Sequence, residues 1–295
     1  MKNKLLLFLK GILMGICDLV PGISGGTIAF ITGIYERLIN AVKGFSLKLI
    51  LSVGNKDKFK TNFKKLDLGF LIVLLLGIFT ALILGSGIIE FLLENYFVYT
   101  LSFFIGLILM SSFVIFEKIR NHNSVNVFFG ILGFVLGLSL IFLVPAVVNP
   151  SLGYVFFGGF VAISAMFLPG ISGAFILLIL GLYEFMLGVL HDISRNINYF
   201  LSFVLGAILG AFVISRVISY LFKKDRCKTL YFLLGLVLGA LSVPIKRVSE
   251  ISVGVLDIGI MLFLFLIGVF MVLNLRKYGK RYEDRLEEIE NKFIE

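Results

Sequence analysis

Charged residues are scarce in this chain. They make up 15% of its 295 residues, whereas soluble domains carry about a quarter. Hydrophobic residues make up 59%, and the mean hydropathy is +1.06. The shortage of charge excludes an ordinary water-soluble domain and indicates that lipid surrounds most of the chain.

Proline, cysteine and histidine are also scarce. The five prolines contrast with 31 glycines, and glycine at this level suits membrane helices whose backbones pack closely. The two cysteines, Cys17 and Cys227, have no metal-binding spacing, so we expect reduced thiols. The two histidines, His122 and His191, fall in predicted loops, which disfavours a histidine nucleophile in the membrane. We therefore predict no metal site and no cofactor.

The net charge of +9 comes from short basic runs between apolar stretches. This arrangement is typical of membrane topology signals and of contact with anionic phospholipid headgroups, and it argues against nucleic acid as a partner. The N-terminal stretch imitates a signal peptide. However, Lys10 interrupts its apolar run and no small-residue cleavage site follows, so we expect it to be retained.

Six stretches are long and apolar enough to cross a bilayer, which takes about 20 residues. Two further regions, 5–42 and 153–190, are too long for one span, and a Pro-Gly pair interrupts each near its middle. Each of these regions is predicted to form a re-entrant hairpin of two half-helices that meet at a non-helical elbow. The predicted spans are 68–93, 98–116, 125–148, 197–222, 229–245 and 254–275.

The basic residues predict the orientation. With both termini in the cytoplasm, most of the 27 lysines and arginines fall on the cytoplasmic side, many of them in the basic loop 43–67. The predicted external stretches hold only Arg195, Lys246 and Arg247. This asymmetry supports the predicted orientation of a multi-pass inner-membrane protein. Residues 276–295 are expected to form a short amphipathic tail. A homodimer is compatible with the sequence, which does not determine the oligomeric state.

The strongest signal is an internal repeat. Residues 21–36 read PGISGGTIAFITGIYE and residues 169–184 read PGISGAFILLILGLYE, with 10 of 16 positions identical at an offset of 148. Weaker similarity between the two halves continues along the following spans, at an offset of 129 residues. Each half then contains one hairpin and three spans, so the second half begins on the opposite side of the membrane. We predict an all-α polytopic membrane protein with two inverted-topology repeats, 1–148 and 149–275.

The duplicated elbows are candidate anion sites. Proline fixes the start of the following half-helix, glycines allow a sharp fold, and hydroxyls add donors. Free N–H groups and the positive end of the helix dipole would point at a phosphate or carboxylate near the midplane. A purely structural kink is the alternative. The predicted substrate-binding residues are Pro21, Gly22, Ser24, Gly25, Gly26, Thr27, Pro169, Gly170, Ser172, Gly173 and Arg216.

Ionisable residues in apolar surroundings are further candidates. Asp18, next to the first elbow, is predicted either to carry a proton or to cap a helix. Glu36 and Glu184 occupy matched positions and are predicted to carry protons, to pair with Arg37 and Arg216, or to lie at the interface. Basic residues at the two mouths are predicted to attract an anionic headgroup, namely Arg37, Lys118, Lys246 and Arg247.

The first elbow lies in the segment MGICDLVPGISGGTIAFITGIYERLI, and the second copy reads AMFLPGISGAFILLILGLYEFML. Both segments resemble the bacterial polyprenyl-phosphate transporter family called PopT. The likeness extends to about residue 275. It implies a flippase that returns undecaprenyl phosphate to the inner leaflet for reuse in envelope polymers, with the motif residues from Asp18 to Thr27 lining the first hairpin. Ala174 and Phe175 depart from the first copy, so donor geometry is expected to differ between the two elbows.

Two other functions remain open from the residues alone. The first is a membrane phosphatase of the undecaprenyl-pyrophosphate kind, although Gly25 stands where the motif of that family has an arginine. The second is a transporter or channel for a small soluble anion. No Gly-Lys-Ser/Thr sequence follows either elbow, so a Walker loop is excluded, and any driving force would be an ion gradient or the lipid gradient itself.

Overall fold

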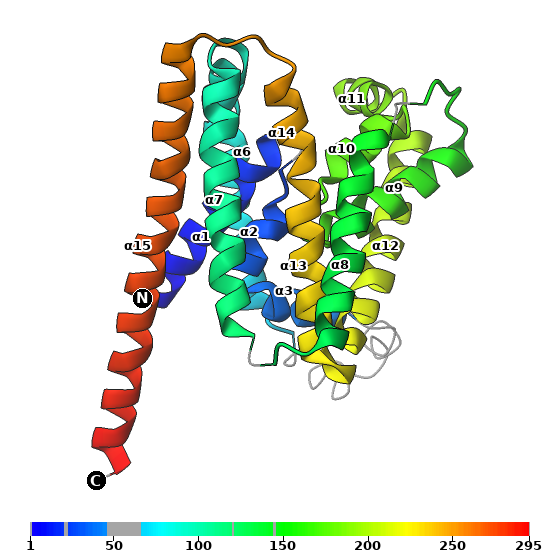
Figure 1. Cartoon of the computed structure of the whole chain (residues 1–295). Coiled ribbons are helices and arrows are strands. Elements are labelled where there is room, and N and C mark those ends of the chain that lie inside the picture. The colour runs from blue at the N-terminus through cyan, green and yellow to red at the C-terminus, as the bar shows by residue number, and fades with distance from the viewer. Residues whose placement is uncertain (1, 21–22, 46–65, 120, 144–145, 295) are drawn as a thin grey trace, which may run out of the picture.

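A computed structural model describes residues 2–20, 23–45, 66–119, 121–143 and 146–294 (Figure 1). Within these ranges the secondary structure is entirely helical. The greater part of the predicted loop 43–67 lies outside the described residues.

Six helical segments are long and apolar enough to span a membrane, which confirms the prediction of an all-helical, multi-pass membrane protein. The third helical segment ends at Phe142, and the last helix runs on through the tail to Ile294. The segments are α6 (Leu68–Asn95), α7 (Phe97–Lys118), α8 (Ser124–Ser139) with the 3-10 turn η1 (Leu140–Phe142), α12 (Ile197–Lys224), α13 (Arg226–Ala240) with α14 (Ser242–Ser249), and α15 (Val255–Ile294).

Each predicted hairpin consists of three helices rather than two. A second break follows the elbow, at Gly33 in one hairpin and at Gly181 in the other. Both glycines have positive φ angles, +75° and +65°, a conformation that favours glycine. The bend between the last two helices of the second hairpin is 109°. The helices are α1 (Lys2–Leu19), α2 (Gly25–Ile31) and α3 (Tyr35–Gly44), then α9 (Leu152–Met166), α10 (Gly173–Ile179) and α11 (Tyr183–His191).

The helix boundaries follow the internal repeat. Helices α2 and α10 each have seven residues and begin 148 residues apart. Helices α6 and α12 each have 28 residues and begin 129 residues apart. The two offsets found in the sequence therefore also separate equivalent structural elements. The opposite orientation of the halves in a membrane stays a prediction.

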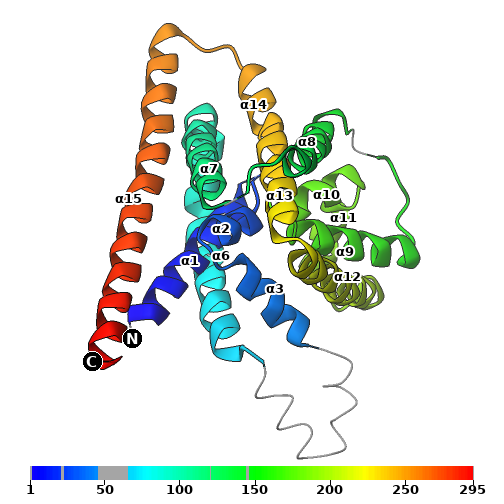
Figure 2. The same cartoon turned by 60° about the horizontal axis from the view of Figure 1, so that its bottom comes forward.

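The halves also pack in equivalent ways. Helix α1 lies along α6 as α9 lies along α12, and α7 pairs with α15 as α13 pairs with α8 (Figure 2). Glycines line these contacts, because a side chain there would collide with the facing backbone. A Cβ at Gly77 on α6 would strike the carbonyl of Phe8 on α1, and one at Gly206 on α12 would strike that of Phe156 on α9.

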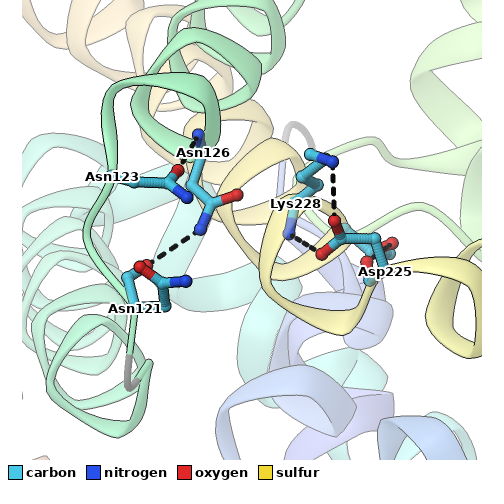
Figure 3. Close-up of polar contacts among 6 residues, drawn as sticks. Asn121, Asn123, Asn126, Asp225 and Lys228 are labelled. Carbon is cyan, nitrogen blue, oxygen red and sulfur yellow. Dashed lines mark hydrogen bonds and ion pairs between the residues drawn. The ribbon is translucent and has the colours of Figure 1, made fainter.

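Two polar turns lie at the same end of the bundle, where the chain passes from α7 to α8 and from α12 to α13 (Figure 1). The side chain of Asn123 accepts a hydrogen bond from the amide of Asn126 and so caps α8. Asp225 caps α13 by accepting from the amide of Lys228, and it also pairs with the Lys228 ammonium at 2.7 Å (Figure 3). Both turns belong to the stretches predicted to face the cytoplasm.

Candidate functional site

The two elbows lie against each other. The Oγ1 atom of Thr27 at the start of α2 accepts a hydrogen bond of 2.8 Å from the amide of Gly170 in the second elbow. The hydroxyl of Tyr35 on α3 donates to the carbonyl of Phe167 at 2.7 Å. Both side chains are buried. The structure therefore brings together the predicted residues of both halves, although Thr27 acts here as an acceptor rather than as a donor.

Internal acceptors occupy the amides of the first elbow. Asp18 Oδ1 accepts from the amide of Gly25 at 2.7 Å, and Ser24 Oγ accepts from the amide of Gly26 at 3.2 Å. A Cβ at Gly25 would collide with the carboxylate of Asp18, so a glycine there allows the carboxylate to approach the helix. A carboxylate of the chain itself thus lies at the positive end of α2.

The second elbow has no such carboxylate. Met166 occupies the position that corresponds to Asp18. The hydroxyl of Ser172 caps α10 through a long contact of 3.5 Å with the amide of Phe175. Among the described residues, the structure records no hydrogen bond donated by the Ser172 or Gly173 amides. The two elbows therefore share a sequence and differ in how their amides are satisfied.

A small pocket lies where the elbows meet the transmembrane helices, and it is large enough for about one water molecule. This space is too small for a phosphate headgroup. Six of the lining residues are Ile23, Ser24, Thr27, Ile108, Gly170 and Leu241.

The three acidic candidates have different surroundings. Asp18 caps α2 through Oδ1, while its buried Oδ2 atom has no hydrogen-bond partner among the residues that the structure describes. Glu36 pairs with Arg226 at 2.9 Å, and not with either of the arginines considered from the sequence. Glu184 is exposed and forms no ion pair within the described part of the chain. The matched glutamates therefore do not share one environment.

Arg216 and the mouth residues contact other parts of the structure. The guanidinium of Arg216 donates to the carbonyls of Phe212 and Phe45 rather than to an elbow. Arg37 pairs with Asp67 at 2.6 Å and lies over the ring of Phe70.

Lys246 lies 3.9 Å from Glu250, and Arg247 is half-exposed in the same short helix, α14. Pro21, Gly22 and the side chain of Lys118 lie outside the described residues. Pro169 is buried in the second elbow.

Sequence reasoning missed two residues near this site. Tyr35 matches Tyr183 in the repeat, but only Tyr35 joins the two halves. Lys43, on the face of α3 that packs on α12, was counted only as part of a basic loop. Its spacing of seven residues from Glu36 was the available signal, since such residues lie on one face of a helix.

A helical membrane bundle built from two similar halves, each with a broken hairpin, has the architecture of a secondary transporter. Over residues 14–259 the chain matches the family described as "VCA0040-like: Undecaprenyl phosphate translocase-like". The chain belongs to this family, which confirms the resemblance seen in the sequence.

Two relatives support the assignment. One, from Vibrio cholerae, is a "Polyprenyl-phosphate transporter" that is 38% identical over 239 residues, covering 81% of this chain and 77% of the relative. Another of the same name, from Staphylococcus aureus, is 28% identical over 252 residues, covering 79% and 83%. The family is one of transporters rather than enzymes, which decides against the phosphatase. No solved structure matches the chain.

Proposed function

We propose that this protein carries a polyprenyl phosphate, with undecaprenyl phosphate as the expected lipid, across the bacterial cytoplasmic membrane. The lipid moves from the outer to the inner leaflet and is reused in the synthesis of envelope polymers. The contact between the elbows, made by Thr27 and Gly170, carries the proposal, because it places the duplicated motif of a lipid-phosphate transporter family at one spot inside the bundle.

The phosphate headgroup binds at the paired elbows. The first elbow already holds the carboxylate of Asp18. The second offers the amides of Ser172 and Gly173, which have no acceptor among the described residues, next to the Ser172 hydroxyl. A phosphate oxygen supplies the acceptor that such amides favour. Ala174 and Phe175 stand where the first elbow has Gly26 and Thr27. This difference between the two elbows is consistent with different roles for them in binding the phosphate.

Transport requires the closed pocket to open. A headgroup is larger than a water molecule, so the elbows must separate, and the Thr27–Gly170 bond must break, before the lipid can bind. Asp18 is suited to couple this step to a proton, because its buried Oδ2 atom has no hydrogen-bond partner in the described part of the chain. Both termini face the cytoplasm in this proposal, and basic side chains near the mouths, such as Arg247, contact anionic headgroups.

The test is the double substitution Ser24→Ala with Ser172→Ala in protein reconstituted into liposomes. We expect the movement of labelled undecaprenyl phosphate between leaflets to be largely lost. Each change also removes a helix cap worth about 1 kcal/mol, so unfolding is measured in parallel. Ser139→Ala, on the exposed face of α8, is the matched control.

Wild-type lipid transport in the double variant would remove the elbows from the mechanism. Flux of inorganic phosphate without movement of the lipid would instead favour the small-anion transporter.

A further inference from the structure

A second polar surface lies where α3 packs against α12, away from the elbows. On α3, Glu36, Asn40 and Lys43 are spaced four and three residues apart and share one face. On α12, Arg216, Ser219 and Lys223 share a face in the same way. The two faces meet: the ammonium of Lys43 donates to Ser219 Oγ at 2.9 Å, and Ser219 Oγ donates to Asn40 Oδ1 at 3.2 Å.

Three cations converge on this surface. The pKa of Lys43 lies below its usual value, because its ammonium is partly desolvated and because Lys223 and Arg216 are close to it. Neutral groups are the partners that the structure records for Lys43 and Arg216. Within the described residues, none of the three cations forms an ion pair. Glu36, the acidic residue on the same face of α3, is already paired with Arg226.

The end of α3 balances only part of this charge. Arg216 donates to the carbonyl of Phe45, the residue that follows the last turn of α3. The negative end of a helix dipole is equivalent to about half an elementary charge, so about two and a half positive charges remain without a compensating group among the described residues. A phosphomonoester carries a charge of about −1.5 to −2 at pH 7, whereas a phospholipid phosphodiester carries −1. The charge therefore matches the monoester better.

The repeat shows that the cluster belongs to one half only. At the equivalent positions, His191 replaces Lys43, Gly87 replaces Arg216 and Glu94 replaces Lys223. The contact itself is also unequal, because α3 packs on α12 while α11 makes no comparable contact with α6 in the described structure. The packing of a duplicated fold does not require the two halves to differ in charge. A charge cluster in one half only is what a function at one mouth of the transporter would need.

We propose that Lys43, Arg216 and Lys223 form a phosphomonoester-binding site at the α3–α12 contact, separate from the elbows. This inference rests on the proposed function for its role. At the mouth predicted to face the cytoplasm, the site holds the lipid headgroup after it leaves the elbows. The same chemistry would bind free inorganic phosphate, and the experiment separates these two sources.

The experiment uses the full chain in a neutral detergent. Lysines are dimethylated with a carbon-13 label, and the Lys43 signal is assigned by its loss in Lys43→Arg. We expect inorganic phosphate and a short-chain prenyl monophosphate each to raise the pKa of Lys43, because a bound anion offsets the neighbouring charges. Dimethyl phosphate, a diester, is expected to leave it unchanged. Tighter binding of the prenyl compound, with displacement of phosphate, identifies a lipid site, and equal affinity identifies an ion site.

Affinity measured by calorimetry supplies the second readout. Lys223→Gln should weaken phosphate binding by about tenfold or more, since it removes a charge-assisted contact. The matched control is Lys224→Gln, because Lys224 lies over the ring of Tyr220 instead. An unresponsive Lys43 signal, or an equal loss in both lysine variants, would overturn the proposal.

The combined Ser24→Ala and Ser172→Ala variant distinguishes the two sites. If both proposals hold, this variant loses lipid transport and keeps the response of Lys43 to phosphate. If the wild-type protein, whose elbows are intact, transports the lipid but its Lys43 signal does not respond to phosphate, this site alone is overturned. Intact transport in the serine variant would overturn the elbow mechanism alone.

Discussion

Thr27→Val is the sharpest test of the contact between the halves. Valine has nearly the shape of threonine but cannot accept the hydrogen bond from the Gly170 amide, which is 2.8 Å long. That amide lies at a break in the chain and has no helical acceptor. A Cβ at Gly170 would lie 2.9 Å from the Cα of Val237, so the elbow is closely packed. The pocket lined by Thr27 and Gly170 has room for about one water molecule, which can replace part of the lost hydrogen bond.

The expected magnitude follows from two limits. A buried donor left without a partner costs about 1–3 kcal/mol. Hydrogen bonds between membrane helices average only about 0.6 kcal/mol and reach about 1.7, because polar groups of the unfolded protein also find partners in the membrane. A water molecule in the pocket beside Gly170 can take up part of the lost bond, so we expect Thr27→Val to lower the free energy of unfolding by about 1 kcal/mol.

The assay is reversible unfolding in mixed micelles with increasing sodium dodecyl sulfate. Thr27→Ser, which keeps the hydroxyl, is the control and should cost less. Tyr35→Phe removes a second side-chain hydrogen bond to the second elbow, the one to the carbonyl of Phe167, and the double variant should show a coupling of at least about 0.5 kcal/mol because both residues hold the same elbow. A Thr27→Val protein no less stable than Thr27→Ser would refute the claim that this bond holds the halves together.

Two further predictions concern helix packing and coupling. Gly77→Leu should prevent the close approach of α1 to α6 and lower the free energy of unfolding by about 3 kcal/mol or more. Gly87→Leu on the same helix, where a Cβ meets open space, should fold normally. Equal stabilities of the two variants in thermal unfolding would contradict the packing argument. Asp18→Asn keeps an oxygen that can accept from the Gly25 amide, but its side chain cannot exchange a proton near neutral pH. We therefore expect a folded protein whose lipid transport is reduced and no longer depends on pH. Normal transport at every pH would exclude Asp18 as the proton carrier.

The sequence predicted the elements of the fold well, because these depend on local properties. Apolar length predicted the six membrane helices, and the Pro-Gly pairs predicted the elbows. The second breaks were missed, although their signal was present, since Gly33 and Gly181 are matched in the repeat. Only the backbone conformation revealed that both have positive φ angles and turn the chain again.

The site depended on contacts between distant parts of the chain. The sequence marked Thr27 and Ser172 as donors, but the packing of the elbows made Thr27 an acceptor for Gly170 across 143 residues. It marked Arg216 as an elbow residue, but the length of α12 carries that side chain to Phe45 at the end of α3.

The sequence by itself therefore determined that this protein is a duplicated, helical membrane transporter, because hydropathy, helix breaks and the repeat act within single segments. Tertiary structure alone decided that the elbows meet, that Asp18 caps only the first of them, and that Lys43, Arg216 and Lys223 converge. The physical reason is that burial and charge balance at a residue depend on which helix packs against it, and a pattern along one segment does not specify its neighbour.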